Sequence, residues 1–449
     1  MESLNRRSFL RKSAASTAGM MVGAPVIAKN LAQNSPNNTI NVAVAGIRSR
    51  GLVYGGGGHC VNLAKIPGVR IVKLCDVDER LLPKAVADLE KITGYKAKTE
   101  VDFRRLLDDK DIDAISIATP DHWHALQTIW ACQAGKDVYV EKPISYTINE
   151  GRRMVQAARK YNRVVQVGTQ SRSSPVVHEA VKLIRQGVLG EVHMGKAFVY
   201  RFRENIGHKE DSPIPEGVHW DMFLGPAPYR PFNENRFHYQ WHWVWDTSTT
   251  EFGNNGTHAM DRIRMAMNKR IHPEKIHCAG NLYNRRGSDQ EVPNFQLATF
   301  EYGDGTILEL EVRCLDTNPE GGEREGSLIY GTEGWMYLNH TVFKTYLGRK
   351  SEPGPSMNGR EIDPPVEQLE PLHFGNWINC VRSRKWQDLN ADILEGHMST
   401  SIMHLGNISY RTGRKLHFNP NSEKFVKDED ADSYLARDYR PPYVMPDAV

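Results

Sequence analysis

A short hydrophobic run that stops at a glycine constrains the fold of this chain more than any other feature. Residues 40–45 (INVAVA) are rich in β-branched side chains, as a strand buried inside a parallel sheet must be. The following turn, from Gly46 to Gly51, matches the G-x-G-x-x-G pattern of dinucleotide-binding folds except that Arg48 replaces the middle glycine. With Arg48 there, the phosphate lies farther from the backbone, or the guanidinium helps to hold it. We predict a dinucleotide-binding turn made by Gly46, Arg48, Ser49, Arg50 and Gly51.

A second predicted strand, residues 69–75, ends at Asp76. A carboxylate at this position accepts hydrogen bonds from the ribose hydroxyls of NAD and repels the 2′-phosphate of NADP. Asp76 follows Gly46 at a longer spacing than the usual ~20 residues, and the glycine run 55–58 looks like the insertion responsible. NAD is therefore the expected cofactor, and NADP remains an alternative because three arginines lie nearby: Arg48, Arg50 and Arg80.

Two further strands are predicted at residues 114–118 and 137–140, with a helix between them over 121–135. Strands that alternate with helices form a doubly wound parallel sheet, whose ligand lies off the carboxyl ends of the strands. The residues that follow these two strands are therefore placed at the cofactor: Thr119, Pro120, Glu141 and Lys142.

The second half of the chain has a different pattern. The full length of 449 residues exceeds what one hydrophobic core usually serves, so two domains are expected. Strands separated by glycine turns predict an α+β domain with a large, open, mostly antiparallel sheet. The predicted strands and helix are 194–200, 297–301, 306–313, 327–330, 335–338 and the helix 175–186. We expect a Rossmann domain over 39–160, a substrate and oligomerisation domain over 161–415, and a tail over 416–449 that wraps over the surface or a partner.

Residues 219–245 are rich in histidine and aromatic side chains. In an extended segment Trp241, Trp243 and Trp245 share one face, and flat aromatic rings suit stacking on a pyranose. A core-filling aromatic cluster or a subunit interface explains the composition equally well. A helix over His238, His242 and Asp246 would allow zinc binding, but tryptophans at every second position favour a strand or loop, so no metal is expected. Arg172 is a further candidate for binding a substrate hydroxyl or carboxylate.

The chain resembles the Gfo/Idh/MocA family of NAD(P)-dependent oxidoreductases over about residues 38–410. The resemblance is carried by the Gly46–Gly51 turn, Cys75-Asp76-Val77-Asp78, Ala118-Thr119-Pro120 with His124, Glu141-Lys142-Pro143, the run 253–261 (GNNGTHAMD) and Gly331-Thr332-Glu333-Gly334. It implies that Lys142 acts on a sugar hydroxyl beside the nicotinamide, that Glu141 orients Lys142, and that His258 is a second acid or base. It also implies a cofactor contact at His124, substrate contacts at Asn254, Asn255 and Asp261, and a dimer or tetramer.

One position departs from the family pattern. Many members carry an acid four residues before the histidine, where this chain has Asn254. An amide can hydrogen-bond a substrate hydroxyl but cannot take its proton. Proton transfer is therefore expected to rest on Lys142 and His258.

The N-terminus is predicted to be an export signal. Residues 1–28 contain the run NRRSFLRK and then a weakly apolar stretch, which resembles a bacterial twin-arginine signal, with 29–38 as a linker. The basic residues of this segment account for the whole net charge of +3, so the rest of the chain is neutral and nucleic acid is not an expected partner. No apolar run reaches the ~18 residues that a membrane span needs.

Together these features predict an exported, NAD-dependent oxidoreductase that transfers a hydride between a tightly held nicotinamide and a secondary hydroxyl of a sugar or glycoside. Two alternatives stay open. One is an NAD-dependent glycoside hydrolase that works by oxidation, elimination, addition of water and reduction. The other is a sugar-binding protein of the same fold without catalytic activity.

Overall fold

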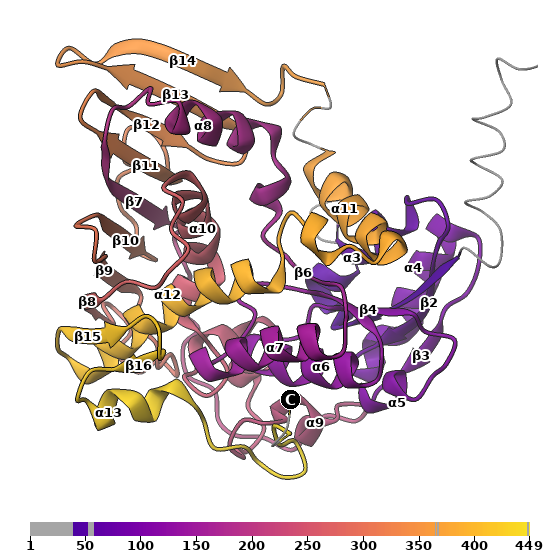
Figure 1. Ribbon diagram of the computed structural model, residues 1–449. Coiled ribbons are helices and arrows are strands. Elements are labelled where there is room, and N and C mark those ends of the chain that lie inside the picture. Colours follow the sequence, from indigo (N-terminus) through magenta and orange to yellow (C-terminus); the bar gives the residue numbers. More distant parts are fainter. Residues whose placement is uncertain (1–38, 53–57, 364, 366–367, 447–448) are drawn as a thin grey trace, which may run out of the picture.

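The computed structural model describes residues 39–52, 58–363, 365, 368–446 and 449. The predicted export signal, the linker and most of the glycine run lie outside these described residues. The chain forms two sheets, one on each side of a group of helices (Figure 1). Among the described residues, no helix is long and apolar enough to cross a membrane.

The first sheet has six parallel strands in the order β3-β2-β1-β4-β5-β6. The predicted doubly wound parallel sheet is therefore confirmed. Its central strands are buried along their whole length, which explains their continuous hydrophobic runs. The strands are β1 (Ile40–Ala45), β2 (Val69–Cys75), β3 (Lys98–Glu100), β4 (Ala114–Ile117), β5 (Asp137–Val140) and β6 (Val165–Val167).

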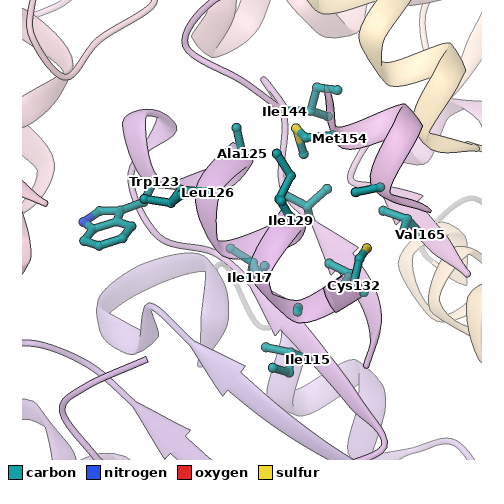
Figure 2. Packing of buried hydrophobic residues seen from close by; sticks show 14 of the residues in the cluster. Ile115, Ile117, Trp123, Ala125, Leu126, Ile129, Cys132, Ile144, Met154 and Val165 are labelled. Carbon is teal, nitrogen blue, oxygen red and sulfur yellow. The ribbon is translucent and has the colours of Figure 1, made fainter. Parts of the chain in front are cut away.

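Helices cover both faces of this sheet: α3 (His59–Ala64), α4 (Leu82–Thr93), α5 (Arg104–Leu107), α6 (Asp121–Gln133) and α7 (Ile148–Lys160). The helix predicted over 121–135 is α6, and its residues Ala125, Ile129 and Cys132 are buried against the sheet. Figure 2 shows Ile129 close to Ile144 and Met154, whereas the indole of Trp123 extends away from them. Trp123 instead reaches a large cavity.

The second sheet has ten strands, in the order β14-β13-β12-β11-β7-β10-β9-β8-β15-β16. Within the described part of the chain only β7 and β10 of this sheet pair in parallel, so the predicted, mostly antiparallel sheet is confirmed. The strands are β7 (Val192–Tyr200), β8 (Lys275–Asn281), β9 (Phe295–Glu301), β10 (Ile307–Arg313), β11 (Glu325–Gly331), β12 (Gly334–Leu338), β13 (Val342–Leu347), β14 (Glu352–Asn358), β15 (Leu416–Asn419) and β16 (Lys424–Phe425). Three helices pack on its inner side: α8 (Pro175–Arg185), α10 (Thr257–Ala266) and α12 (Ile393–Thr412) (Figure 1).

The two domains are less separate along the chain than the predicted boundaries imply. Strand β6 lies beyond residue 160 but completes the first sheet. Helix α11 (Leu369–Ser383) returns to the first domain, where Phe374 stacks on Tyr139 with ring centroids 4.3 Å apart. The predicted tail begins with β15 and β16 of the second sheet, and then places Tyr443 and Met445 in the core of the first domain. Hydrophobic burial, which does not follow sequence order, sets these boundaries.

Candidate active site

A cavity of about 540 Å³ lies off the carboxyl ends of the parallel strands. It is centred where the strand order reverses between β1 and β4, which is the place where doubly wound sheets bind ligands. Most of the predicted site residues line it, and they come from both domains: Gly46, Arg48, Ser49, Arg50, Asp76, Thr119, Pro120, His124, Glu141, Lys142, Trp241, Asn254, Asn255 and His258.

The glycine turn forms a short π-helical segment, Ile47–Gly51. Gly46 has φ +81°, and a Cβ there would lie 2.5 Å from the backbone of Ala118. A Cβ on Gly51 would lie 2.1 Å from the carbonyl oxygen of Gly46. A side chain at either glycine would collide with the backbone, so both positions require glycine, as the motif predicts. The side chain of Arg48 is exposed and borders the cavity.

Asp76 follows β2 and borders the cavity. Its carboxylate accepts hydrogen bonds from the backbone N–H groups of Ile47 (2.9 Å) and Asp78 (3.0 Å). Burial raises the pKa of Asp76 to about 6, and these N–H groups oppose the rise. The carboxylate is thereby held beside the glycine turn, where it suits ribose hydroxyls. The tight turn, this acceptor and the cavity at the switch point together fit a dinucleotide.

Lys142 follows β5 and precedes a cis peptide bond to Pro143. Its Nζ donates a hydrogen bond of 2.5 Å to the carbonyl oxygen of Asn254 in the second domain. Burial lowers the pKa of Lys142, although the carboxylates of Glu141 and Asp121 favour its charged form. The amine therefore lies in the cavity wall and not in bulk solvent.

Among the described residues, Glu141 makes no hydrogen bond to the Lys142 amine, but its carboxylate accepts one from the Lys142 backbone N–H at 3.3 Å. One oxygen of its buried carboxylate contacts Arg50 Nε (2.9 Å) and His59 Nε2 (3.0 Å). Arg50 also pairs with Glu370 of the α11 segment at 2.7 Å. Despite the cost of burial, Arg50 and His59 hold the pKa of Glu141 well below its usual value. The guanidinium of Arg50 is thus held between two carboxylates in the cavity wall.

His124 has a similar structural role. Its Nδ1 lies 2.7 Å from the carbonyl oxygen of Pro143 and its Nε2 lies 2.6 Å from that of Thr119. Both ring nitrogens therefore face backbone carbonyl oxygens, one after β4 and one after Lys142, and a neutral ring donates to one of the two. His124 thus supports the cavity wall.

His258 is the second residue of α10, and its ring lines the cavity. Burial and the positive charge of Lys142 lower the pKa of His258 well below its usual value. Among the described residues, no group forms a hydrogen bond with this ring. A neutral imidazole is therefore available to a ligand.

Asn254 and Asn255 lie in the segment Phe252–Gly256 before α10, and both side-chain amides donate to Glu251. Glu251 is 1% exposed and also pairs with Arg203 at 2.9 Å. Neither this carboxylate, which comes three residues before Asn254, nor Asp121 is among the site residues predicted from the sequence. Asp121 lines the cavity near Lys142, and burial raises its pKa. Asp121 directly follows Thr119-Pro120 at the end of a predicted strand, and this position in the sequence could have indicated it as a site residue.

The proposed substrate contacts of Arg172 and Asp261 are not supported. Arg172 Nε and Nη2 contact both carboxylate oxygens of Asp261 at 2.9–3.0 Å, and Nη2 also contacts Glu395 at 3.0 Å. Neither Arg172 nor Asp261 borders the cavity. A buried, bidentate ion pair joins the helices here, and its charges are already satisfied.

The aromatic segment is not extended. Residues His238–Trp243 form a 3-10 helix, so the tryptophans do not share a face. Trp241 lines the cavity, whereas Trp243 is buried elsewhere and donates to Gln240. The hypothetical zinc ligands also diverge, because His238 contacts Asp78 and Asp246 pairs with Arg230.

Another group of ligand-type side chains lies outside the cavity. His272 Nε2 and His397 Nε2 each lie 2.8 Å from the same oxygen of Glu423. Arg152 pairs with that carboxylate as well. Because the Arg152 guanidinium already pairs with this carboxylate, we interpret the group as a hydrogen-bonded cluster.

Comparison with known proteins agrees with this geometry. The relative "Glycosyl hydrolase family 109 protein 1" of Shewanella sp. (strain ANA-3) is 26% identical over 230 residues, which cover 47% of this chain and 50% of that protein. The match thus spans about half the length of the relative.

Two solved structures have the same fold. Levoglucosan dehydrogenase in complex with NADH and levoglucosan has a TM-score of 0.63 and 17% identity, covering 84% of this chain and 99% of its own. The WlbA dehydrogenase from Bordetella pertussis, in complex with NADH and UDP-GlcNAcA, has a TM-score of 0.61 and 21% identity, covering 85% and 98%.

Family profiles match both domains. Residues 40–169 match the oxidoreductase family's NAD-binding Rossmann fold. Residues 174–445 match the C-terminal alpha/beta domain of the same oxidoreductase family. The chain therefore belongs to the Gfo/Idh/MocA family of oxidoreductases.

Proposed function

We propose that this protein is an NAD-dependent oxidoreductase that acts on a secondary hydroxyl of a sugar or glycoside. The observation that carries the proposal is that Lys142 and His258, from different domains, line the same cavity as the glycine turn and Asp76. A proton-transfer group thus lies in reach of the place where a dinucleotide fits.

A nicotinamide held in this cavity would supply the hydride acceptor. Oxidation of a hydroxyl also requires a base for its proton, and a base is most effective when its pKa is near the working pH. Burial lowers the pKa of Lys142 in that direction, so we assign Lys142 Nζ as the base that accepts the proton of the substrate hydroxyl. His258 is kept neutral and holds the substrate hydroxyl by a hydrogen bond. The carbonyl of Asn254 fixes the direction of the lysine amine.

The choice of NAD over NADP rests on Asp76. Its carboxylate borders the cavity, and a negative charge beside the ribose disfavours a 2′-phosphate. Arg50, one of the arginines that could have compensated, is held by Glu141 and Glu370. Arg80 is likewise paired with Asp78 at 2.7 Å.

The first test is the cofactor content of the purified protein. We expect denaturation to release a nicotinamide nucleotide, and we expect sugars or methyl glycosides to change absorbance at 340 nm when added to the native protein. A protein that carries no nucleotide and binds none when it is supplied would contradict the proposal. Sugar binding without any redox change would instead support the non-catalytic alternative.

A second candidate function is glycoside hydrolysis by transient oxidation of the sugar. The match to a glycosyl hydrolase family 109 protein favours it, and the same lysine and histidine would serve. Release of nitrophenol from aryl glycosides without net NADH formation distinguishes this function from the dehydrogenase.

We also propose that the protein is exported with its cofactor bound and works as a dimer or tetramer. The support is the NRRSFLRK run at residues 5–12 and the resemblance to exported family members. Replacing Arg6 and Arg7 by lysine is expected to retain the protein in the cytoplasm, which cell fractionation measures. Light scattering after size-exclusion chromatography measures the oligomeric state.

A further inference from the structure

Three arginines line the part of the cavity beyond Lys142 and His258: Arg201, Arg203 and Arg262. Two of them are neutralised by carboxylates. Arg201 pairs with Glu325 at 2.9 Å, and Arg203 pairs with Glu251 at 2.9 Å. Arg262 makes no ion pair with any residue that the structure describes.

Arg262 is nevertheless 1% exposed. It lies four residues after His258 on α10, so the two side chains project from the same face of the helix. Its guanidinium has only long contacts to two hydroxyls: Nε to Ser327 Oγ at 3.3 Å and Nη1 to Ser171 Oγ at 3.5 Å. Its Nη2 is buried without a hydrogen-bond partner among the described residues.

Two other buried arginines of this region form ion pairs with carboxylates. Arg264, two residues along the same helix, contacts the Glu395 carboxylate at 3.1 Å and Ser399 at 2.6 Å. Arg172 contacts two carboxylates. A buried charge without a partner is costly, so folded proteins pair such charges within the chain or reserve them for a ligand. Arg262 borders the cavity, which makes a ligand the simplest partner.

The charge balance around His258 leads to the same conclusion. Lys142 does not need an anionic ligand, because burial lowers its pKa, as a base requires, and the carboxylates of Glu141 and Asp121 favour its charged form. Among the described residues no carboxylate is within ion-pair distance of Arg262, and Glu325 acts on it only from farther away. A neutral sugar would leave this guanidinium without an anionic partner, whereas an anionic sugar would supply one.

We propose that the substrate carries a carboxylate, as a uronic acid or its glycoside does, and that Arg262 with Ser171 binds this group. The fork of a guanidinium matches the two oxygens of a carboxylate, and the hydroxyl of Ser171, which also lines the cavity, can donate a further hydrogen bond. Ser327 instead donates to the carbonyl oxygen of Ala259 and helps to place the guanidinium. His258 and Lys142 then lie beside the ring hydroxyls of the same sugar. This inference rests on the proposed function of the site.

The test compares uronic acids with their neutral counterparts on the holoenzyme: methyl glucuronide against methyl glucoside, and methyl galacturonide against methyl galactoside. Calorimetric titration measures binding, and absorbance at 340 nm measures redox change. We expect tighter binding of at least one uronide. Because a charge-assisted hydrogen bond contributes about 1.5–3 kcal/mol, Arg262→Gln is expected to weaken uronide binding by about 10- to 100-fold. Binding of the neutral sugar should change little.

Arg264→Gln is the matched control, because Arg264 lies on the same helix, is equally buried and does not border the cavity. It is expected to lower the melting temperature without changing the uronide-to-neutral ratio. Equal affinity for the two sugar classes, or a ratio that Arg262→Gln leaves unchanged, would overturn the inference and leave the oxidoreductase proposal intact. Failure of every sugar to bind or react would overturn both.

Discussion

The amine of Lys142 donates a hydrogen bond of 2.5 Å to the backbone carbonyl oxygen of Asn254. Lys142 follows a strand of the parallel sheet, and Asn254 precedes helix α10 of the second domain. The bond therefore joins the two domains at the wall of the cavity, and it uses a main-chain acceptor that substitution of the Asn254 side chain leaves in place. The position of this one amine depends on how the domains pack.

Replacing Lys142 by methionine should abolish most redox activity. Removal of a positioned proton-transfer group typically costs about 10²- to 10⁴-fold in rate. Arginine at this position keeps the charge but does not lose its proton, so Lys142→Arg should be similarly inactive. Single-turnover absorbance at 340 nm measures both variants, and retained nucleotide shows that the site is folded. Near wild-type rates in both would exclude Lys142 as the base.

The same lysine should reduce stability. Burial lowers its pKa in the folded state, so the unfolded chain binds more protons at this position between the folded-state and unfolded-state pKa. The cost of burying the charged lysine, in free energy of unfolding, is therefore largest below the folded-state pKa. This cost disappears as pH rises towards the pKa of the unfolded chain. Lys142→Met is expected to raise the melting temperature at pH 7, with a smaller gain at pH 10. A destabilised variant at pH 7 would contradict this.

Asp76 should control cofactor choice. Asp76→Ser removes the negative charge that disfavours a 2′-phosphate, so the ratio of NADP to NAD affinity is expected to rise. Because burial raises the pKa of Asp76 to about 6, the wild-type carboxylate should lose its charge below that pH, and discrimination against NADP should weaken there. Fluorescence titration of nucleotide-free protein with each cofactor, at pH 5 and pH 8, measures both effects.

The C-terminal segment should help to retain the cofactor. Tyr443 is 4% exposed, borders the cavity, packs edge-on against Trp123 and donates to Asp221 at 2.8 Å. Loss of a buried aromatic side chain costs about 3–5 kcal/mol, so Tyr443→Ala should lower the melting temperature and speed nucleotide loss during dialysis. Tyr443→Phe keeps the ring and removes only the hydroxyl, so it should behave nearly as wild type.

The Glu423 cluster should make the fold sensitive to acid. Arg152, His272 and His397 hold the pKa of Glu423 below its usual value although burial opposes this, and burial lowers the pKa of His397 to about 4. The ionised Glu423 carboxylate stabilises the folded protein fully above the pKa it has in the unfolded chain. This stabilisation is lost as pH falls through the pKa it has in the folded protein. The neutral histidine adds a further loss as pH falls from about 6.5, its unfolded pKa. Glu423→Gln should cost about 3 kcal/mol at pH 7 by urea unfolding.

Metal addition tests the interpretation of that cluster. Because Arg152 occupies the carboxylate, added zinc is expected to leave the melting temperature of the native protein unchanged. A rise that Glu423→Gln removes would show that the cluster is a metal site.

Much of the cofactor half could be predicted because local patterns there report directly on geometry. A strand that ends at Gly46, and others that end before Asp76, Thr119 and Glu141, place these residues at one edge of a parallel sheet. The predicted site residues whose charges the structure pairs within the chain are those that meet a distant partner. Arg172 meets Asp261 and Glu395, and Arg50 meets Glu370, across separations that no local pattern encodes.

The aromatic segment shows the same limit at shorter range. Spacing at every second residue predicts an extended strand for Trp241, Trp243 and Trp245, but the segment His238–Trp243 forms a 3-10 helix. Contacts outside the segment decide this, such as the one from His238 to Asp78 and the burial of Trp243.

The amino-acid sequence by itself determined the two kinds of sheet, the dinucleotide turn and the presence of Lys142 and His258 at element ends. Those features depend on side-chain periodicity and backbone freedom, which neighbouring residues set. Only the tertiary structure decided which charges meet a partner, and therefore which remain available to a ligand. Arg172 and Arg264 are neutralised by acids far along the chain, whereas Arg262 is not. Electrostatic pairing acts through space, so it becomes visible only when the whole chain is folded.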